Sequence, residues 1–66
     1  MIDTNALKGA IVTKGLTQEE VAKKIGIQPQ TFYRKMDRGI FLSNEIEFMI
    51  DLLDIQDPVA IFFAKK

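Results

Sequence analysis

Residues 16–36 read LTQEEVAKKIGIQPQTFYRKM, and this stretch decides the expected fold. Thr17 and Glu20 have the spacing of a capping box, in which each side chain accepts a hydrogen bond from the other residue's backbone N–H. Gly26 suits the left-handed conformation that commonly ends a helix. The pattern therefore predicts a short helix that begins after Thr17 and ends at Gly26.

A second helix start follows directly. Gln28 precedes a proline, which biases it away from helical geometry and suits it to an N-cap position. Pro29 fits the first helical position, where a missing N–H leaves no hydrogen bond unmade. Phe32 and Met36 lie four residues apart on one face, so we expect them to anchor this helix to the core. Two short helices joined by a glycine turn are predicted.

Three further helices are expected from similar signals. Asp3 or Thr4 begins the first, which ends at Gly15; Ser43 caps a helix over about residues 44–53; Asp57 and Pro58 begin the last. Apolar residues at helical spacing are expected in the core, namely Leu7, Ala10, Ile11, Val21, Ala22, Ile25, Phe32, Met36, Ile46, Met49, Ile50 and Leu53. No strand pattern is present, so the expected fold is all-α: one compact five-helix domain over residues 1–66.

Composition excludes several function classes. The chain has no His and no Cys, which removes the commonest acid–base group, the strongest nucleophile and the usual transition-metal ligands. The carboxylates of the C-terminal half have the spacing of a solvated helix face. We therefore expect no enzyme, no cofactor, no metal and no small-molecule substrate. No apolar run reaches the ~18 residues of a membrane span, and no signal peptide is evident, so a cytoplasmic location is expected.

Charge is unevenly distributed although the net charge is zero. Residues 1–38 carry seven Lys/Arg against four Asp/Glu, whereas residues 39–64 carry five Asp/Glu and no Lys/Arg. A basic half beside an acidic half suits a domain that presents one face to phosphates. The alternative is a chance imbalance in a short chain.

The helix over about residues 29–36 carries the functional prediction. Two helices joined by a glycine turn are typical of a helix-turn-helix, whose second helix fits the major groove of DNA. Arg34 can pair with guanine and Gln30 with adenine, while Thr31 can contact a thymine methyl group. These three residues are the expected base contacts.

A second group of side chains is expected on the DNA backbone, where polar and basic groups fix position without reading sequence. This group comprises Gln18, Gln28, Tyr33, Lys35 and Arg38. The alternative is that the basic residues form an ordinary solvated helix end. The combination with the capped helix–glycine–helix spacing favours DNA contact.

The C-terminal half has more apolar residues than one small core needs. Phe48, Leu52 and Phe63 are the candidates for a protein interface, with burial in the core as the alternative. Pairing two domains about a two-fold axis would double the number of base pairs contacted. We therefore expect a homodimer on DNA.

The stretch over residues 16–27 resembles the helix-turn-helix of Cro/CI-type phage regulators, the XRE family. Thr-Gln at the helix start, Val-Ala in its middle and Gly-Ile at the turn carry the resemblance, and residues 43–63 resemble the fourth and fifth helices of the family. The resemblance implies a lambda-repressor-like five-helix fold and operator binding as a dimer. It puts the phosphate-contacting glutamine at Gln18 and base-reading positions at Pro29, Gln30 and Arg34.

The chain departs from the family pattern at two positions. Pro29 replaces a polar residue and has no side-chain donor, and Lys35 replaces a common apolar residue. The register of the base contacts is therefore expected to differ. No second, oligomerising domain is evident in the 66 residues, which favours a Cro-like phage or prophage repressor.

Two hypotheses follow from the sequence. The first is a transcriptional regulator that reads double-stranded operator DNA with the helix over about residues 29–36. The alternative is a protein-binding antirepressor that acts on a partner phage repressor through the acidic, apolar C-terminal half. Zero net charge and the acidic C-terminal half favour the alternative. The side chains that oppose it are Gln30, Arg34, Lys35 and Arg38.

Overall fold

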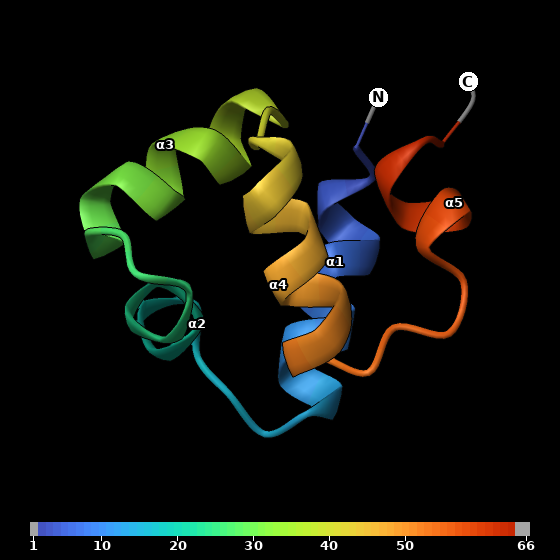
Figure 1. Cartoon of the computed structure of the whole chain (residues 1–66), viewed down its shortest axis with the longest axis horizontal. Helices are drawn as coiled ribbons and strands as arrows, with labels where there is room; N and C mark the ends of the chain where they lie inside the picture. The colour runs from blue at the N-terminus through green and yellow to red at the C-terminus, as the bar shows by residue number, and fades with distance from the viewer. Residues whose placement is uncertain (1, 65–66) are drawn as a thin grey trace.

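A computed structural model describes residues 2–64, and these residues form five α-helices and no strand (Figure 1). The helices are α1 (Thr4–Thr13), α2 (Gln18–Ile25), α3 (Pro29–Arg38), α4 (Ser43–Leu52) and α5 (Pro58–Phe62). The expected all-α, five-helix architecture is confirmed. None of these helices combines the length and apolar character needed to cross a membrane.

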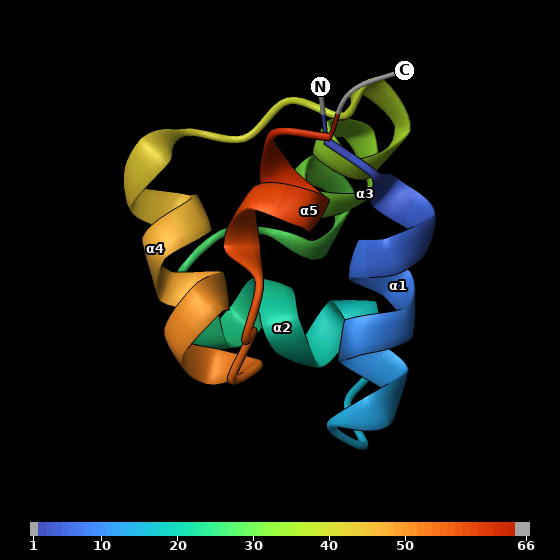
Figure 2. The same cartoon turned by 90° about the vertical axis from the view of Figure 1, so that its right-hand side faces the viewer.

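Helix α2 lies at the centre of the packing, because it contacts α1, α3 and α4. In Figure 1 α2 is seen nearly end-on while α3 lies across the view, so the two helices cross steeply at the turn that joins them. Figure 2 shows α1 and α4 on opposite sides of the molecule, with α5 nearest the viewer. Helix α3 is thereby left at one edge, with its outer side uncovered.

The capping box at the start of α2 is confirmed. The Thr17 backbone N–H donates to Glu20 Oε1 at 2.9 Å, and the Glu20 backbone N–H donates to Thr17 Oγ1 at 3.1 Å. Gly26 ends the helix with a φ of 85°, in the left-handed region that favours glycine. The Ile27 N–H then donates to the Ala22 carbonyl at 3.0 Å, which closes the turn. The local sequence therefore sets where α3 can begin.

Other helix ends agree with expectation except at α4. Asp3 Oδ1 accepts the Ala6 N–H at 3.0 Å, and Asp57 Oδ1 accepts the Ala60 N–H at 3.3 Å, so both are N-caps. The prediction that Ser43 caps α4 is wrong. Leu42 is the N-cap, and its backbone N–H donates to Glu45 Oε1 at 2.8 Å. Glu45, in the first turn of α4, thus accepts the N–H of the N-cap residue, and no side chain at the N-cap position caps the helix.

The core gathers side chains from all five helices. Its largest fully buried members are Phe32, Leu7, Ile11, Met49 and Val21. The predicted anchors Phe32 and Met36 are both buried, which holds α3 against the body. Four residues expected in the core are only half-buried, namely Ala10, Ile25, Ile46 and Ile50.

Phe41 and Glu45 are buried, although neither was expected in the core. Phe41, in the connection between α3 and α4, packs its ring at a tilt on Phe32, with centroids 5.4 Å apart. Glu45 is only 4% exposed, although the carboxylates of this half were expected on a solvated face. That expectation is wrong for Glu45, because its position on α4 faces α3 rather than solvent.

Candidate nucleic-acid interface

The outer side of α3 holds the residues predicted to read bases. Gln30 and Arg34 are exposed and lie four residues apart, so they share one face of the helix. Thr31 is half-buried at the edge of that face. Arg38 is exposed one turn beyond Arg34, so the stripe has two guanidinium groups. The structure brings these four side chains to one surface, which has the width of a single helix.

Lys35 has a different environment from its neighbours. Its Nζ donates to both carboxylate oxygens of Glu45, at 2.7 and 2.6 Å. The Lys35 side chain is 24% exposed and that of Glu45 is 5% exposed. Its charge is therefore balanced inside the protein. A phosphate contact by Lys35, as predicted from the sequence, would have to compete with this ion pair.

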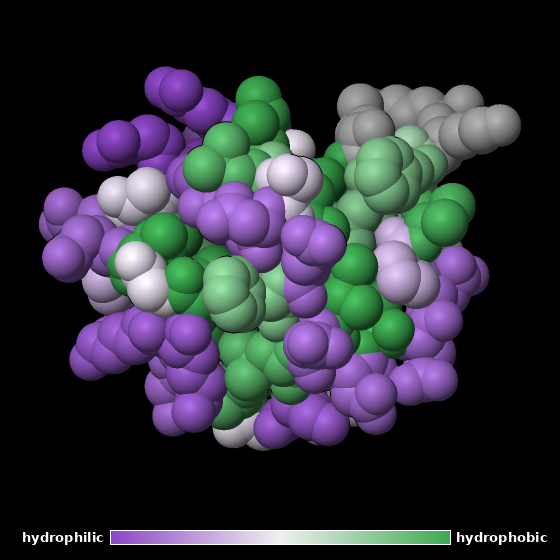
Figure 3. Space-filling model, in the orientation of Figure 1, coloured by the Kyte–Doolittle hydropathy of each residue, from purple (hydrophilic) through white to green (hydrophobic). Residues whose placement is uncertain are grey.

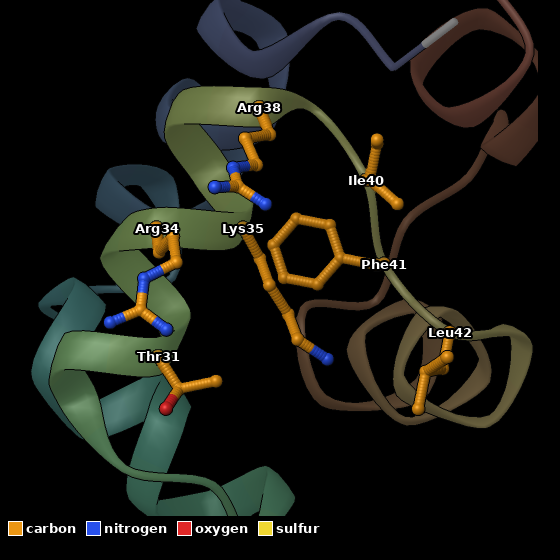
Figure 4. Close-up of a pocket in the computed structure, with 7 residues that line it drawn as sticks. All are labelled: Thr31, Arg34, Lys35, Arg38, Ile40, Phe41 and Leu42. Carbon is orange, nitrogen blue, oxygen red and sulfur yellow. The ribbon is translucent and has the colours of Figure 1, made fainter.

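A groove opens between α3 and the loop that leads to α4 (Figure 4). Its volume is about 280 Å³. The groove is lined by α3 and by the loop. The lining residues are Thr31, Arg34, Lys35 and Arg38 of α3 and Ile40, Phe41 and Leu42 of the loop. Figure 4 shows the arginine side chains on one side, the loop residues on the other and the Phe41 ring between them. We call this feature the basic groove.

The apolar wall of the basic groove was not expected from the sequence. Ile40 is 66% exposed and Leu42 is 59% exposed. The run Ile40-Phe41-Leu42 contains the signal, because only its middle residue is needed to fill the core. An exposed apolar pair beside two arginines marks a surface suited to a partner with both charge and apolar area.

A second hollow is lined by two of the residues predicted to contact the DNA backbone. Gln18, at the start of α2, and Tyr33, on α3, line it together with Thr4, Lys8, Met36 and Asp37. Lys8 was missed by sequence reasoning, because nothing in the local pattern of α1 places it beside α3. A helix N-terminus with an amide, a phenol and an ammonium group suits a phosphate. The Asp37 carboxylate opposes that charge.

Gln28 occupies the N-cap position of α3, as predicted, but its side chain makes no capping hydrogen bond. The side chain is exposed. Its amide is therefore accessible to solvent. Pro29 follows at the first helical position, also as predicted.

The three candidate interface residues lie on two helices. Phe48 is 56% exposed on α4, where it shares a shallow hollow with Asn44, Glu47 and Asp51. Phe63 is 64% exposed and follows α5, four residues after Val59, which is 63% exposed. Leu52 is half-buried and packs against the core. An acidic setting surrounds Phe48, whereas Val59 and Phe63 form an uncharged stripe.

Among residues 2–64, no group of three His, Cys, Asp or Glu side chains is arranged to hold a metal ion. Comparison with models of protein families, with curated proteins and with solved structures gives no match. The resemblance to Cro/CI-type regulators therefore stays an expectation.

Proposed function

We propose that this protein is a sequence-specific DNA-binding transcriptional regulator of the Cro/CI type. In this proposal α2 and α3 form a helix-turn-helix, and α3 enters the major groove of an operator. The observation that carries it is the exposed stripe of Gln30, Arg34 and Arg38 on a helix anchored by Phe32 and Met36. An exposed polar helix face on a buried apolar anchor is what major-groove reading requires.

The side chains divide into two roles. Arg34 pairs with guanine and Gln30 with adenine, while Thr31 contacts a thymine methyl or a phosphate. Gln18, Tyr33 and Lys8 meet one phosphate at their shared hollow, and Arg38 meets another beyond the end of α3. Gln28 contacts the backbone at the start of α3. Lys35 positions α3 through Glu45 instead of binding phosphate.

The DNA-bound form in this proposal is a homodimer. Val59 and Phe63 form an exposed, uncharged pair on and after α5, the kind of surface that a second copy can cover. Figure 1 shows α5 at the opposite side of the molecule from the start of α3, so a partner there leaves α3 uncovered. Two recognition helices would then read two half-sites. The regulator acts in the cytoplasm, where operators are found.

Selection from random duplexes tests the proposal. The protein is mixed with a library of random double-stranded oligonucleotides, and bound sequences are enriched over several rounds. We expect one preferred sequence whose affinity falls steeply with salt. Arg34→Ala should cost about 1–3 kcal/mol of binding free energy and relax preference at one base pair. Lys24→Ala, on the exposed side of α2, is the matched control.

One observation favours a second candidate, the antirepressor. Phe48 lies exposed among the carboxylates of Glu47 and Asp51, a surface that suits a basic, apolar protein segment. Two results together would favour this candidate over DNA reading. The selection would enrich no DNA sequence, and the protein would bind a co-encoded repressor saturably, with that binding abolished by Phe48→Ala.

A further inference from the structure

One face of α4 presents an aromatic side chain between two carboxylates. Asn44, Glu47, Phe48 and Asp51 line one shallow hollow, and their spacing places them along a single face of the helix. Within residues 2–64, neither Glu47 nor Asp51 takes part in an ion pair. Figure 3, which looks onto α4, shows hydrophobic surface bordered by hydrophilic side chains. We call these four residues the acidic face.

The basic groove has the opposite character. Lys35 is neutralised by Glu45, but Arg34 and Arg38 have no ion-pair partner among the described residues. Its apolar side consists of Ile40 and Leu42. The volume of about 280 Å³ exceeds the roughly 150 Å³ of a cavity that takes up benzene, so the groove has room for a phenyl ring.

The two surfaces are continuous along the chain and complementary in charge. Leu42 lines the basic groove, and Asn44, two residues later, lines the acidic face. Two guanidinium groups on the groove match two carboxylates on the face, and none of the four takes part in an ion pair within residues 2–64. Acidic faces placed directly against each other would repel. A two-fold axis between groove and face instead brings each groove onto the other copy's face, in an isologous contact.

We propose that a second copy of this chain docks on this surface, with Phe48 of each copy inserted into the basic groove of the other. Glu47 and Asp51 then face the partner's Arg34 and Arg38. The contact is small, so the dimer is weak and forms as concentration rises. Salt weakens it, because exposed charges are screened.

This dimer has a regulatory consequence that rests on the proposed function. It covers Arg34 and Arg38, the side chains proposed to meet DNA, so the same groove cannot hold a partner and an operator together. Self-association through this surface therefore stores the protein in a form that does not bind DNA. The DNA-bound dimer through Val59 and Phe63 is a different assembly.

Charge-reversed variants test the contact by sedimentation equilibrium at low salt, in the absence of DNA. All proteins carry Phe63→Ser, so that the stripe after α5 does not contribute. Glu47→Arg/Asp51→Arg makes the surface wholly basic, and Arg34→Glu/Arg38→Glu makes it wholly acidic. The parent is the protein that carries Phe63→Ser alone, and we expect it to dimerise. Each charge-reversed variant alone should remain monomeric, and an equimolar mixture of the two should dimerise. Phe48→Ala should raise the dissociation constant about tenfold or more.

A control variant completes the test of the contact. Lys23→Glu/Lys24→Glu, on α2, changes the net charge by as much as Arg34→Glu/Arg38→Glu and should leave dimerisation intact. Circular dichroism verifies that every variant is helical. A parent that stays monomeric up to about 1 mM, or a mixture that stays monomeric, overturns the contact.

A DNA competition then tests the regulatory consequence. Random-sequence duplex DNA added to the parent should dissociate the dimer; a duplex that binds while the dimer persists overturns the masking. A Phe48→Ala monomer that binds no DNA would count against the proposed function, while the DNA-free mixture still decides the contact.

Discussion

Lys35 and Glu45 form a bidentate ion pair that joins α3 to α4, with Nζ at 2.7 and 2.6 Å from the two carboxylate oxygens. Glu45 Oε1 also accepts the Leu42 N–H at 2.8 Å, so one carboxylate holds α3, the loop and the start of α4 together. The loop fixed in this way carries the apolar wall of the basic groove. The pair therefore sets the shape of the surface beside Arg34.

Removing the Lys35 ammonium should destabilise the protein strongly. Lys35→Met leaves a carboxylate that is 4% exposed with only one backbone donor. We expect the free energy of unfolding to fall by about 2–3 kcal/mol, below the 3–5 kcal/mol of a fully buried pair, because Lys35 retains solvent contact. Urea denaturation measures the change.

The exposed pair of Lys23 and Glu19, at 3.2 Å, supplies the control. Lys23→Met should change the free energy of unfolding by about 0.5 kcal/mol or less, because water and salt screen such pairs. Equal losses for Lys35→Met and Lys23→Met would show that the Lys35 pair has no special structural role.

Salt dependence separates the roles of the basic residues on α3. Arg38→Ala should lower the slope of log affinity against log salt by about one, because one phosphate contact is lost. The double variant Lys35→Met/Glu45→Leu removes two charges that already balance each other, so the slope should stay unchanged. Filter binding of the selected duplex over a range of salt concentrations gives both slopes. A reduced slope in the double variant would instead place Lys35 on the DNA.

Apart from the start of α4, the helix boundaries were predictable because their causes are local. The Thr17–Glu20 capping box, the Gly26 turn and the Asp57 cap each depend on residues within one turn of one another, and all three are present. The anchors Phe32 and Met36 were predictable for a similar reason, since helical spacing alone puts them on one face. Residue types and their spacing within one segment are enough to find such features.

Features that depend on distant packing were not predictable. Glu45 resembles any other surface carboxylate on α4 until α3 brings Lys35 against it, ten residues away in sequence. Phe41 joins the core only because the loop folds its ring onto Phe32. Lys8 reaches the hollow of Gln18 and Tyr33 through the packing of α1. No local pattern carries these relationships, because each is created by the tertiary fold.

Two glycine substitutions should have opposite effects on stability. Gly26→Ala places a Cβ at a φ of 85° and should cost about 1–2 kcal/mol, although no atom within 4 Å would clash with it. Gly9→Ala lies inside α1, also with open space around the new Cβ, and should stabilise by roughly 0.5–1 kcal/mol. Thermal denaturation of the two variants compares them directly. Equal shifts would mean that the left-handed turn at Gly26 is not required.

Pairing through the Val59–Phe63 stripe should matter only on a duplex with two half-sites. Val59→Ser/Phe63→Ser replaces two exposed apolar side chains with small polar ones, so the fold should be retained. Affinity for a duplex with both half-sites should fall by about 10²-fold, because linking two binding sites raises apparent affinity by at least that factor. Affinity for a single half-site should not change, since α3 is untouched. Val12→Ser, at a residue 73% exposed on α1, is the control and should affect neither duplex. Equal losses on both duplexes would show that the stripe supports the fold and does not pair the two copies.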